Sequence, residues 1–189
     1  EGDSVRMKYT VPSNLVAIGN GKLRNISTNN DKSTYEWFVS NPINNYNISV
    51  QIGNYVAVQD TFIKDNTIHN MNHYVLDYNE ELASNFFPQS KEVIRFYEKY
   101  FGDYQWYEDG YKLVEVPYLG MEHQSAVTYG NGFSMYNGVR SKSWPMYGVI
   151  DPLIIHETGH EWFGNSVTAS DPTHIWIHEG LQVYSESIY

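Results

Sequence analysis

A pair of histidines four residues apart constrains this chain more than any other feature of its sequence. In the run His156-Glu157-Thr158-Gly159-His160, both imidazoles lie on one face if the segment is an α-helix, because residues four apart are one turn apart. Two imidazoles on one face can bind one metal ion, and the glutamate between them can accept a proton from a metal-bound water. The pattern predicts a helix that carries metal ligands His156 and His160 and the general base Glu157.

The residues before this run favour a helix that begins at the right place. Asp151 is a good N-cap residue, and Pro152 suits the first helical position. Leu153, Ile154 and Ile155 then begin an apolar face. The segment is therefore expected to be helical from Pro152 onward.

A catalytic zinc usually has three protein ligands and leaves its fourth position to water. The chain has no cysteine, so the third ligand must be another histidine or a carboxylate. Glu179 is the candidate, nineteen residues past His160 and near the start of a second expected helix. We expect one zinc per chain, bound by His156, His160 and Glu179, although two imidazoles and a carboxylate suit several first-row metal ions.

These residues, with Trp162-Phe163-Gly164-Asn165 downstream, resemble the gluzincin metallopeptidases and specifically the aminopeptidase N family, which has a thermolysin-like catalytic domain. The resemblance covers nearly the whole chain. It implies a zinc-dependent aminopeptidase that removes amino-terminal residues from peptides.

A separate motif supports the resemblance. The run Gly120-Met121-Glu122-His123 is similar to the Gly-x-Met-Glu-Asn motif of that family, which binds the free amino terminus of the substrate. The resemblance therefore implies that Gly120, Met121, Glu122 and His123 bind substrate, here a peptide with a free amino terminus. Because an internal peptide bond carries no charge, a carboxylate at Glu122 would select exopeptidase substrates.

Four positions depart from the family pattern. Leu119 stands where a small residue is usual, and His123 stands where asparagine is usual. Glu161 replaces the common glutamine, and His178 replaces the common asparagine. If His123 lies beside Glu122, its protonation would repel the substrate ammonium, so we expect activity to fall below about pH 6.5.

Two further residues are candidates for supporting the metal site. Metal-bound histidines normally donate their other ring N–H to a carboxylate or carbonyl. Glu186, seven residues beyond Glu179 and on the same helical face, is the candidate carboxylate, although an exposed acid on a helix face is equally expected there. Asn165 is either a support for the site or a cap at the carboxyl end of the zinc helix.

The expected fold class is α+β. Residues 1–59, with alternating apolar positions and Gly/Asn turns, are interpreted as the end of an antiparallel amino-terminal β domain. Strands are expected at residues 15–18, from Leu23 through Ile26, and at residues 35–39, and the alternation of Ile48, Val50 and Ile52 predicts another half-buried strand.

Residues 60–189 are interpreted as the first part of the thermolysin-like domain. We expect strands at residues 74–76, 112–116 and 125–129, a helix from Ser90 to Phe101 that Gly102 ends, and a long loop from residue 130 to 148. The resemblance implies that the rest of this domain, including a tyrosine that stabilises the oxyanion, lies outside the chain. The chain alone is then expected to have weak or no peptidase activity.

Composition narrows the choice of partner. The chain has 12 basic and 22 acidic residues, and its formal net charge of −10 argues against nucleic acid and anionic membrane surfaces as partners. No apolar run is long enough to span a bilayer. The absence of cysteine excludes disulfides and leaves the compartment open.

Two rival functions remain open. A thermolysin-like endopeptidase would differ by cleaving substrates with a blocked amino terminus, and a non-catalytic module would bind metal or peptide without hydrolysis.

For several other histidine and aromatic residues, an ordinary structural role is the simpler expectation. His69, His73 and His174 are expected to be polar or half-buried residues, Trp162 and Phe163 to be core residues, and Phe133, Tyr136 and Trp144 to line a pocket or pack on the surface.

Overall fold

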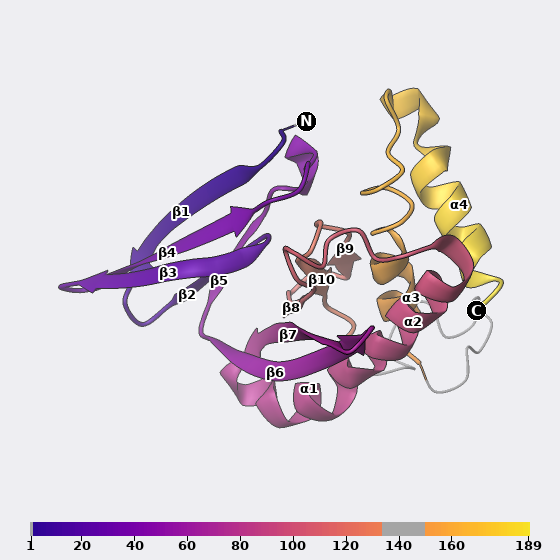
Figure 1. Ribbon diagram of the computed structural model, residues 1–189. Helices are drawn as coiled ribbons and strands as arrows, with labels where there is room; N and C mark the ends of the chain where they lie inside the picture. Colours follow the sequence, from indigo (N-terminus) through magenta and orange to yellow (C-terminus); the bar gives the residue numbers. More distant parts are fainter. Residues whose placement is uncertain (1, 134–149) are drawn as a thin grey trace.

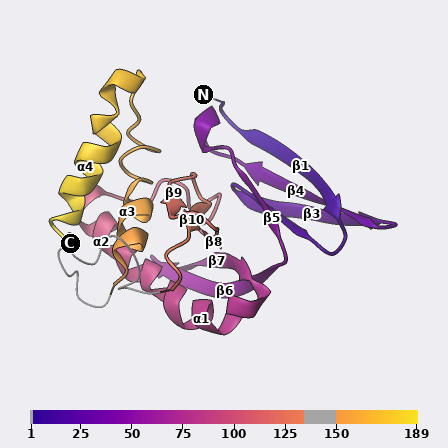
Figure 2. The same ribbon diagram turned by 180° about the vertical axis from the view of Figure 1, so that it is seen from behind.

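The computed structural model of the chain describes residues 2–133 and 150–189. Its fold class is α+β, as expected. Strands β1 to β5 form a layer on one side of the molecule, and the helices lie on the other side, with a five-stranded sheet between them (Figures 1 and 2). The amino terminus lies at the β layer, and the carboxyl terminus lies at the end of the last helix (Figure 1).

The β layer contains two small antiparallel sheets. Strands β1 (Val5–Pro12), β4 (Lys32–Val39) and β3 (Lys22–Asn29) form a three-stranded sheet in the order β1-β4-β3. Strand β2 (Val16–Gly19) pairs with β5 (Val50–Gly53). The expected strands at residues 15–18, 23–26 and 35–39 are therefore present.

The core of the β layer explains why β4 forms. Tyr35, Trp37 and Val39 alternate with half-buried residues, and Trp37 is only 1% exposed. The Trp37 indole N–H donates to the carbonyl of Ala17 at 2.9 Å, so the buried polar atom of this ring has a partner. The edge of Trp37 meets Tyr74 of the five-stranded sheet, with ring centroids 6.0 Å apart. The two layers therefore share apolar contacts.

The expected half-buried strand forms as β5, but the burial of its apolar face was predicted wrongly. Val50 and Ile52 are 38% and 51% exposed, and Ile48 just before the strand is 36% exposed. The alternation of apolar and polar residues indicates a strand, but it does not say which face other elements cover. Among the described strands, β5 pairs only with β2, and its apolar face is turned away from the core.

The central sheet has the strand order β6-β7-β8-β10-β9. Strands β6 (Tyr55–Lys64) and β7 (Thr67–Leu76) form an antiparallel hairpin. Strand β8 (Leu113–Glu115) is parallel to β7 and β10 (Val127–Tyr129), and β9 (Gly120–Met121) is antiparallel to β10. This sheet carries the segment with the expected substrate-binding residues at its edge.

The β6–β7 hairpin was not predicted in full, since only the end of β7 was expected as a strand. Asp65 and Asn66 at its turn have φ angles of 48° and 63°, a left-handed pair typical of tight hairpin turns. Because β6 runs unbroken across residues 59 and 60, the expected domain division there cuts a strand. We propose that the division lies near residue 54, where the chain passes from β5 to the central sheet.

In the part of the chain that the structure describes, four α-helices cover or flank this sheet: α1 (Glu80–Phe86), α2 (Ser90–Phe101), α3 (Pro152–Gly159) and α4 (Trp176–Glu186). Helix α2 has the expected bounds, and Gly102, with φ of 94°, ends it. Short 3-10 helices occur at η1 (Asn45–Asn47), η2 (Asp77–Asn79), η3 (Phe87–Gln89) and η4 (Pro172–His174).

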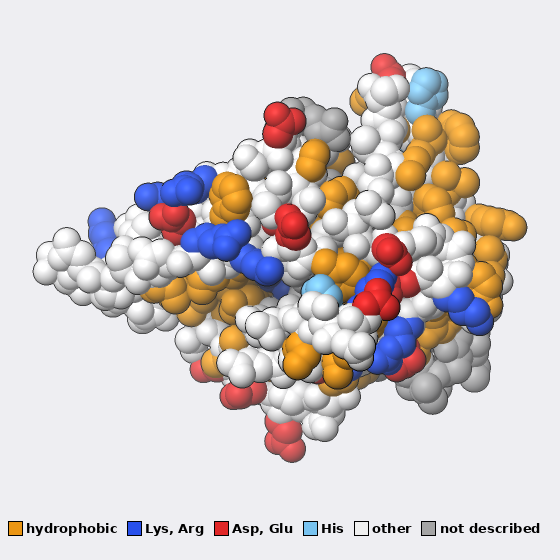
Figure 3. Space-filling view, viewed as in Figure 1, with side chains coloured by type: hydrophobic (Ala, Val, Ile, Leu, Met, Phe, Trp, Pro, Cys, Tyr) orange, Lys and Arg blue, Asp and Glu red, His pale blue; other side chains and the backbone are white. Residues whose placement is uncertain are grey.

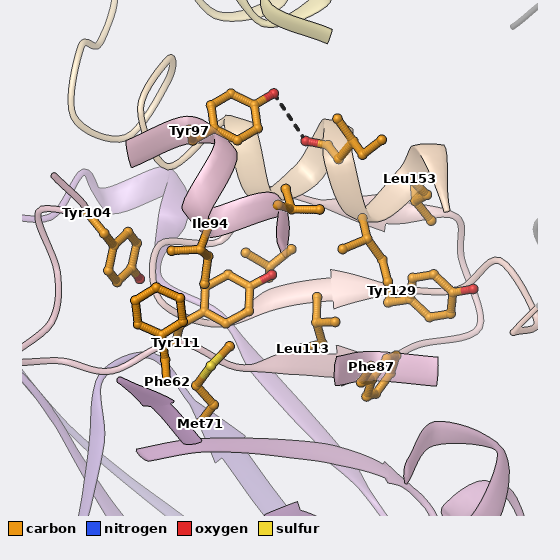
Figure 4. Packing of buried hydrophobic residues seen from close by; sticks show 14 of the residues in the cluster. Phe62, Met71, Phe87, Ile94, Tyr97, Tyr104, Tyr111, Leu113, Tyr129 and Leu153 are labelled. Atoms are coloured by element: carbon orange, nitrogen blue, oxygen red, sulfur yellow. Dashed lines mark hydrogen bonds between the residues drawn. The ribbon is translucent and has the colours of Figure 1, made fainter. Parts of the chain in front are cut away.

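The main core lies between the central sheet and helices α2 and α3 (Figure 4). Its aromatic rings pack edge to face or stacked, as Phe87 does against Tyr129 and Tyr97 against Trp162. Tyr129 also donates its hydroxyl to the carboxylate of Asp151 at 2.8 Å. Since Asp151 caps helix α3, the core fixes the start of that helix.

The described chain contains no helix both long and apolar enough to cross a membrane.

Helix α4 buries one side and exposes the other. Trp176, Val183 and Tyr184 on α4 are 60%, 52% and 64% exposed. Figure 3 shows hydrophobic surface in the region of α4. An exposed apolar face of this kind indicates a contact surface.

Candidate metal centre and substrate cleft

Helix α3 brings the two histidines together as expected. The Asp151 carboxylate accepts a hydrogen bond from the Leu153 N–H at 2.7 Å, and Pro152 occupies the first turn. The helix ends at Gly159, and His160 keeps a helical conformation just beyond it. As a result, the Nε2 atoms of His156 and His160 lie 3.2 Å apart.

Gly159, inside the motif, is required by packing. A Cβ atom at this position would lie 2.1 Å from the Tyr97 hydroxyl of α2 and 2.2 Å from the Gln182 side-chain oxygen of α4. Three helices therefore meet at a point where no side chain fits. Glycine at this point lets α4 approach α3 closely enough to bring its own acidic residues to the histidines.

Glu179 in the first turn of α4 completes the expected ligand set. Its Oε2 atom lies 3.8 Å from Nε2 of both His156 and His160. Zinc bonds of about 2.0–2.1 Å in a tetrahedral arrangement place neighbouring donor atoms roughly 3.3 Å apart. Separations of 3.2, 3.8 and 3.8 Å are close to this value, so the three side chains fit one zinc ion with small adjustments.

Glu157 lies beside this centre and is buried, with 6% of its surface exposed. Together with His156 and His160 it forms a group whose potential ligand atoms lie within 4.8 Å of one another. Strand β9 packs directly on its carboxylate, since a Cβ atom at Gly120 would lie 2.6 Å from Glu157 Oε1. The absence of a side chain at Gly120 therefore keeps the Glu157 carboxylate in place and accessible.

The second nitrogen of each imidazole has its own partner. His156 Nδ1 lies 2.5 Å from Glu186 Oε1, and His160 Nδ1 donates to the carbonyl of Phe163 at 2.8 Å. Burial lowers the pKa of His160, and the neighbouring His156 lowers it further. Burial also acts to lower the pKa of His156, but the hydrogen bond to Glu186 and nearby carboxylates outweigh it, so that pKa is raised. The Nδ1 contacts thus orient both rings with their Nε2 atoms toward one another and toward Glu179.

Replacing Glu186 with glutamine should lower the zinc affinity of the site by about 10- to 100-fold, because an amide supports the His156 ring less strongly than a carboxylate. Zinc competition against a chromophoric chelator measures this directly. Glu81→Gln, on the exposed side of α1, is the matched control and should leave the affinity unchanged. An unchanged affinity in Glu186→Gln would show that Glu186 is only a packing residue.

A cavity of about 520 Å³ opens beside the metal centre. Its walls come from η1 of the β layer, strand β9, the segment before α4, and α4 itself. Glu179 and Glu122 both line it, and Glu122 is buried with 8% of its surface exposed. The Tyr46 hydroxyl lies 3.5 Å from Glu122 Oε1. The cavity therefore joins the expected metal ligand Glu179 to the expected anchor for an amino group.

The two histidines that depart from the family pattern, His123 and His178, lie near this cavity. His178 is buried, lines the cavity, and accepts a hydrogen bond from the Ala169 N–H at 2.9 Å, so it positions the segment before α4. His123 is half-buried, and burial lowers its pKa despite the charge of Glu122 and a hydrogen bond to the Asn47 backbone.

Asn165 does more than cap the zinc helix. Its backbone N–H donates to the carbonyl of His160 at 2.9 Å, so the cap is made by the main chain. Its side chain instead donates to the carbonyl of Glu122 at 2.8 Å and to Glu161 Oε2 at 3.1 Å. The Asn165 side chain thus joins the zinc helix to the expected substrate-binding segment.

The remaining histidine and aromatic candidates have ordinary structural roles. Trp162 is a core residue, as expected, and Phe163 packs against the core. His73 is fully buried and accepts from the Leu113 N–H, whereas His174 is exposed. Three aromatic residues were expected to line a pocket or to pack on the surface. Of these, Phe133 packs on Tyr129, and Tyr136 and Trp144 lie outside the described residues.

Three residues at the site were missed from sequence. Tyr46 and Asn47 lie in an Asn-rich segment that reads as an ordinary turn, and Glu161 was noted only as a departure from a family pattern. Glu161 is 1% exposed, and burial raises its pKa to about 8. The available signal was that a carboxylate, Glu161, directly follows the expected metal ligand His160. The hydrogen-bond partners of Glu161, however, come from distant parts of the chain.

Comparison with known proteins identifies the family of the chain. A family model described as the peptidase family M1 domain matches residues 86–189. Aminopeptidase M1-D from Oryza sativa subsp. japonica is 23% identical over 190 residues, covering 95% of this chain and 20% of the relative. Endoplasmic reticulum aminopeptidase 2 from Homo sapiens is 32% identical over 106 residues, covering 52% of this chain and 10% of the relative.

Solved structures show the same fold. An M1 zinc metallopeptidase from Deinococcus radiodurans has a TM-score of 0.78 at 18% identity, covering 97% of this chain and 39% of that chain. A mutant of that metallopeptidase was solved with a Tyr-Ser-Ala substrate, and a mutant two-domain M1 zinc metallopeptidase was solved with L-arginine. The present chain spans about a fifth of the rice relative. From the family match and the motifs it contains, the chain belongs to peptidase family M1.

Proposed function

We propose that the protein is a zinc-dependent aminopeptidase that hydrolyses the amino-terminal peptide bond of peptides. The observation that carries this proposal is the shared cavity, which Glu179 of the metal centre and the buried carboxylate of Glu122 both line. The matched relatives are aminopeptidases by name, and a neighbouring structure holds a tripeptide. The proposal extends these properties to the present protein.

The side chains divide the work of hydrolysis. His156, His160 and Glu179 would hold the zinc ion, which when bound would lower the pKa of a water ligand and polarise the scissile carbonyl. Glu157 would take a proton from the attacking water and pass it to the leaving amine, which must be protonated to depart. Its burial against Gly120 keeps it beside the ligand atoms of His156 and His160.

Glu122 would select peptides with a free amino terminus. A substrate ammonium at ~4 Å from a carboxylate, in an effective dielectric of ~20, gains roughly 4 kcal/mol, about a thousandfold in affinity before desolvation is counted. Gly120 and Met121 of β9 would pair with the extended backbone of the substrate beside it. The distance from Glu122 to the metal centre would then determine which peptide bond of the substrate reaches the metal.

The test compares two substrates and one substitution. The zinc-loaded protein is assayed with leucyl-4-nitroanilide and with its N-acetylated form, and we expect hydrolysis of the free amine only. Glu122→Gln should lower kcat/KM for the free amine by up to about a thousandfold, because the amide lacks the charge that pairs with the ammonium. Zinc content should stay unchanged.

The outcomes separate the rival functions. Glu80→Gln, an exposed glutamate at the start of α1, is the control for a lost carboxylate. Equal hydrolysis of blocked and free substrates would indicate an endopeptidase. Zinc binding without hydrolysis of either substrate, in a protein that contains the complete catalytic domain, would indicate a binding module.

The acidic side of the pH profile should depend on His123. Protonation of His123 places a positive charge beside Glu122 and opposes the substrate ammonium. Because burial lowers the pKa of His123, the protonated form accumulates only below pH 6.5, and kcat/KM should fall from there. A His123→Asn enzyme should lose this part of the acidic limb. The same limb in both enzymes would show that another group titrates.

We also propose that the exposed apolar face of α4 packs against further parts of a longer catalytic domain. Two facts support this: the chain spans 39% of the matched metallopeptidase structure, and Trp176 and Tyr184 on that face are exposed. A tyrosine that stabilises the oxyanion would lie in those parts. Since losing such a donor typically costs about 10²- to 10³-fold in rate, the 189-residue chain alone should hydrolyse peptides weakly or not at all.

A further inference from the structure

A buried polar junction connects the β layer to the metal centre. It consists of the side chains of Asn20, Asn47, Glu161 and Asn165, each 7% exposed or less. Asn47 belongs to η1 in the β layer, and its Nδ2 donates to Asn165 Oδ1 at 2.7 Å. Side chains far apart in sequence are therefore linked directly, with no exposed atom between them.

The hydrogen bonds fix the orientation of both amides. The Glu122 carbonyl can only accept, so Asn165 presents its Nδ2 to this carbonyl, and the same Nδ2 lies 3.1 Å from Glu161 Oε2. Its Oδ1 then faces Asn47, which must in turn present its own Nδ2. Among the described residues, Asn47 Oδ1 has no hydrogen-bond partner, which is a cost for a buried amide. The orientation of Asn47 is thus set by the link to Asn165.

The segment from Glu122 to Ser125 is held at two ends by different partners. At Ser125, the backbone N–H donates to Glu161 Oε1 at 2.7 Å, and the side chain accepts from the Gly21 N–H at 2.8 Å. At Glu122, the side-chain contact to the backbone is the bond from Asn165. Asn47 therefore acts on the Glu122 end through Asn165, whereas the Ser125 end also has the bond from Gly21. Glu161 accepts from both Ser125 and Asn165 and so joins the two ends.

We propose that Asn47 is a positioning residue for recognition of the substrate amino terminus, acting through Asn165 on the backbone of Glu122. This inference rests on the proposed role of Glu122. By fixing the Asn165 amide, Asn47 holds the Glu122 backbone against the end of the zinc helix and sets the distance from the Glu122 carboxylate to the metal centre. The β layer thereby determines which free amines bind.

The test measures ligand preference and backbone opening together in the purified zinc-loaded protein. Affinities for L-leucinamide and N-acetyl-L-leucinamide are measured by calorimetry, and hydrogen exchange is followed at the amides of residues 121–123. In Asn47→Ala, the preference for the free amine should fall about tenfold, the size expected when a buried hydrogen bond is lost. Exchange at residues 121–123 should rise by a similar factor, while the amide of Val116, which donates to the carbonyl of Tyr129 at 2.9 Å in the central sheet, serves as an internal reference and stays protected.

The controls separate positioning from general damage. Asn45→Ala removes an exposed amide from the same 3-10 helix and should change nothing. Zinc content should remain about one per chain in every variant. In the double variant Asn47→Ala/Asn165→Ala, the loss of preference should equal that of Asn165→Ala alone, because both residues act through one bond. If Asn47→Ala does not fold, Asn47→Ser, which is too short to reach Asn165, takes its place.

Each outcome is decisive. Unchanged preference and unchanged exchange at residues 121–123 in a folded Asn47 variant would overturn the inference. Additive losses in the double variant would overturn the route through Asn165. If the unmodified protein binds free and blocked amides equally, the proposed role of Glu122 fails and the functional inference fails with it, while exchange still reports whether Asn47 holds this segment.

Discussion

Replacing Glu157 with glutamine should lower kcat for peptide hydrolysis by about 10²- to 10⁴-fold and leave zinc bound. Glutamine has nearly the same shape, so the packing of strand β9 on this side chain would be kept. It cannot accept a proton from water at neutral pH, so the attacking nucleophile would not be generated. The effect should appear in kcat, because Glu157 acts on the reacting atoms rather than on the substrate amino group.

The measurement is steady-state hydrolysis of a free-amine substrate, with zinc content determined on the same sample. Glu98→Gln, whose carboxylate pairs with Lys64 far from the centre, is the control for loss of a partly buried acid. A variant that keeps zinc and retains more than about a tenth of its kcat would contradict the general-base role. Loss of zinc in Glu157→Gln would show instead that this carboxylate belongs to the metal site.

Replacing His160 with alanine should remove zinc from the protein. His160 is one of the three proposed ligand side chains and is 1% exposed, so its removal would leave the ion with only two protein ligands. The affinity should fall by more than the roughly 100-fold typical of changes around the ligands, and metal content should drop from about one zinc per chain to near zero. Elemental analysis after gel filtration provides the number.

His174→Ala is the matched control, because His174 is exposed and should leave the metal content unchanged. Stability gives a second readout, since zinc that binds only the folded state raises the free energy of unfolding. A chelator should therefore lower the melting temperature of the unmodified protein and have little effect on His160→Ala. If the unmodified protein binds no zinc even after supplementation, either the chain does not organise its site or the central motif has been misinterpreted.

Local sequence predicted the elements that carry the metal centre. Asp151 and Pro152 define the start of α3 through a cap and a fixed φ angle, which need no distant partner. The spacing of His156 and His160 follows from the helical repeat alone. Glu179 and Glu186 are likewise related by the repeat of α4. These relations lie within single helices, so the sequence determines them.

Tertiary structure decided the rest. The hairpin β6–β7 and the exposed face of β5 depend on which strands pair and what covers them, and neither follows from alternation. Asn47 reads as one turn residue among many, and it gains its place at the site only because the folded chain brings η1 to Glu122 and Asn165. Hydrogen bonds between residues more than 100 positions apart, such as Asn47 to Asn165, have no local pattern to reveal them. The sequence by itself determined the proposed metal ligands, whereas only the folded chain determined how the β layer contacts the proposed amino-terminus site beside them.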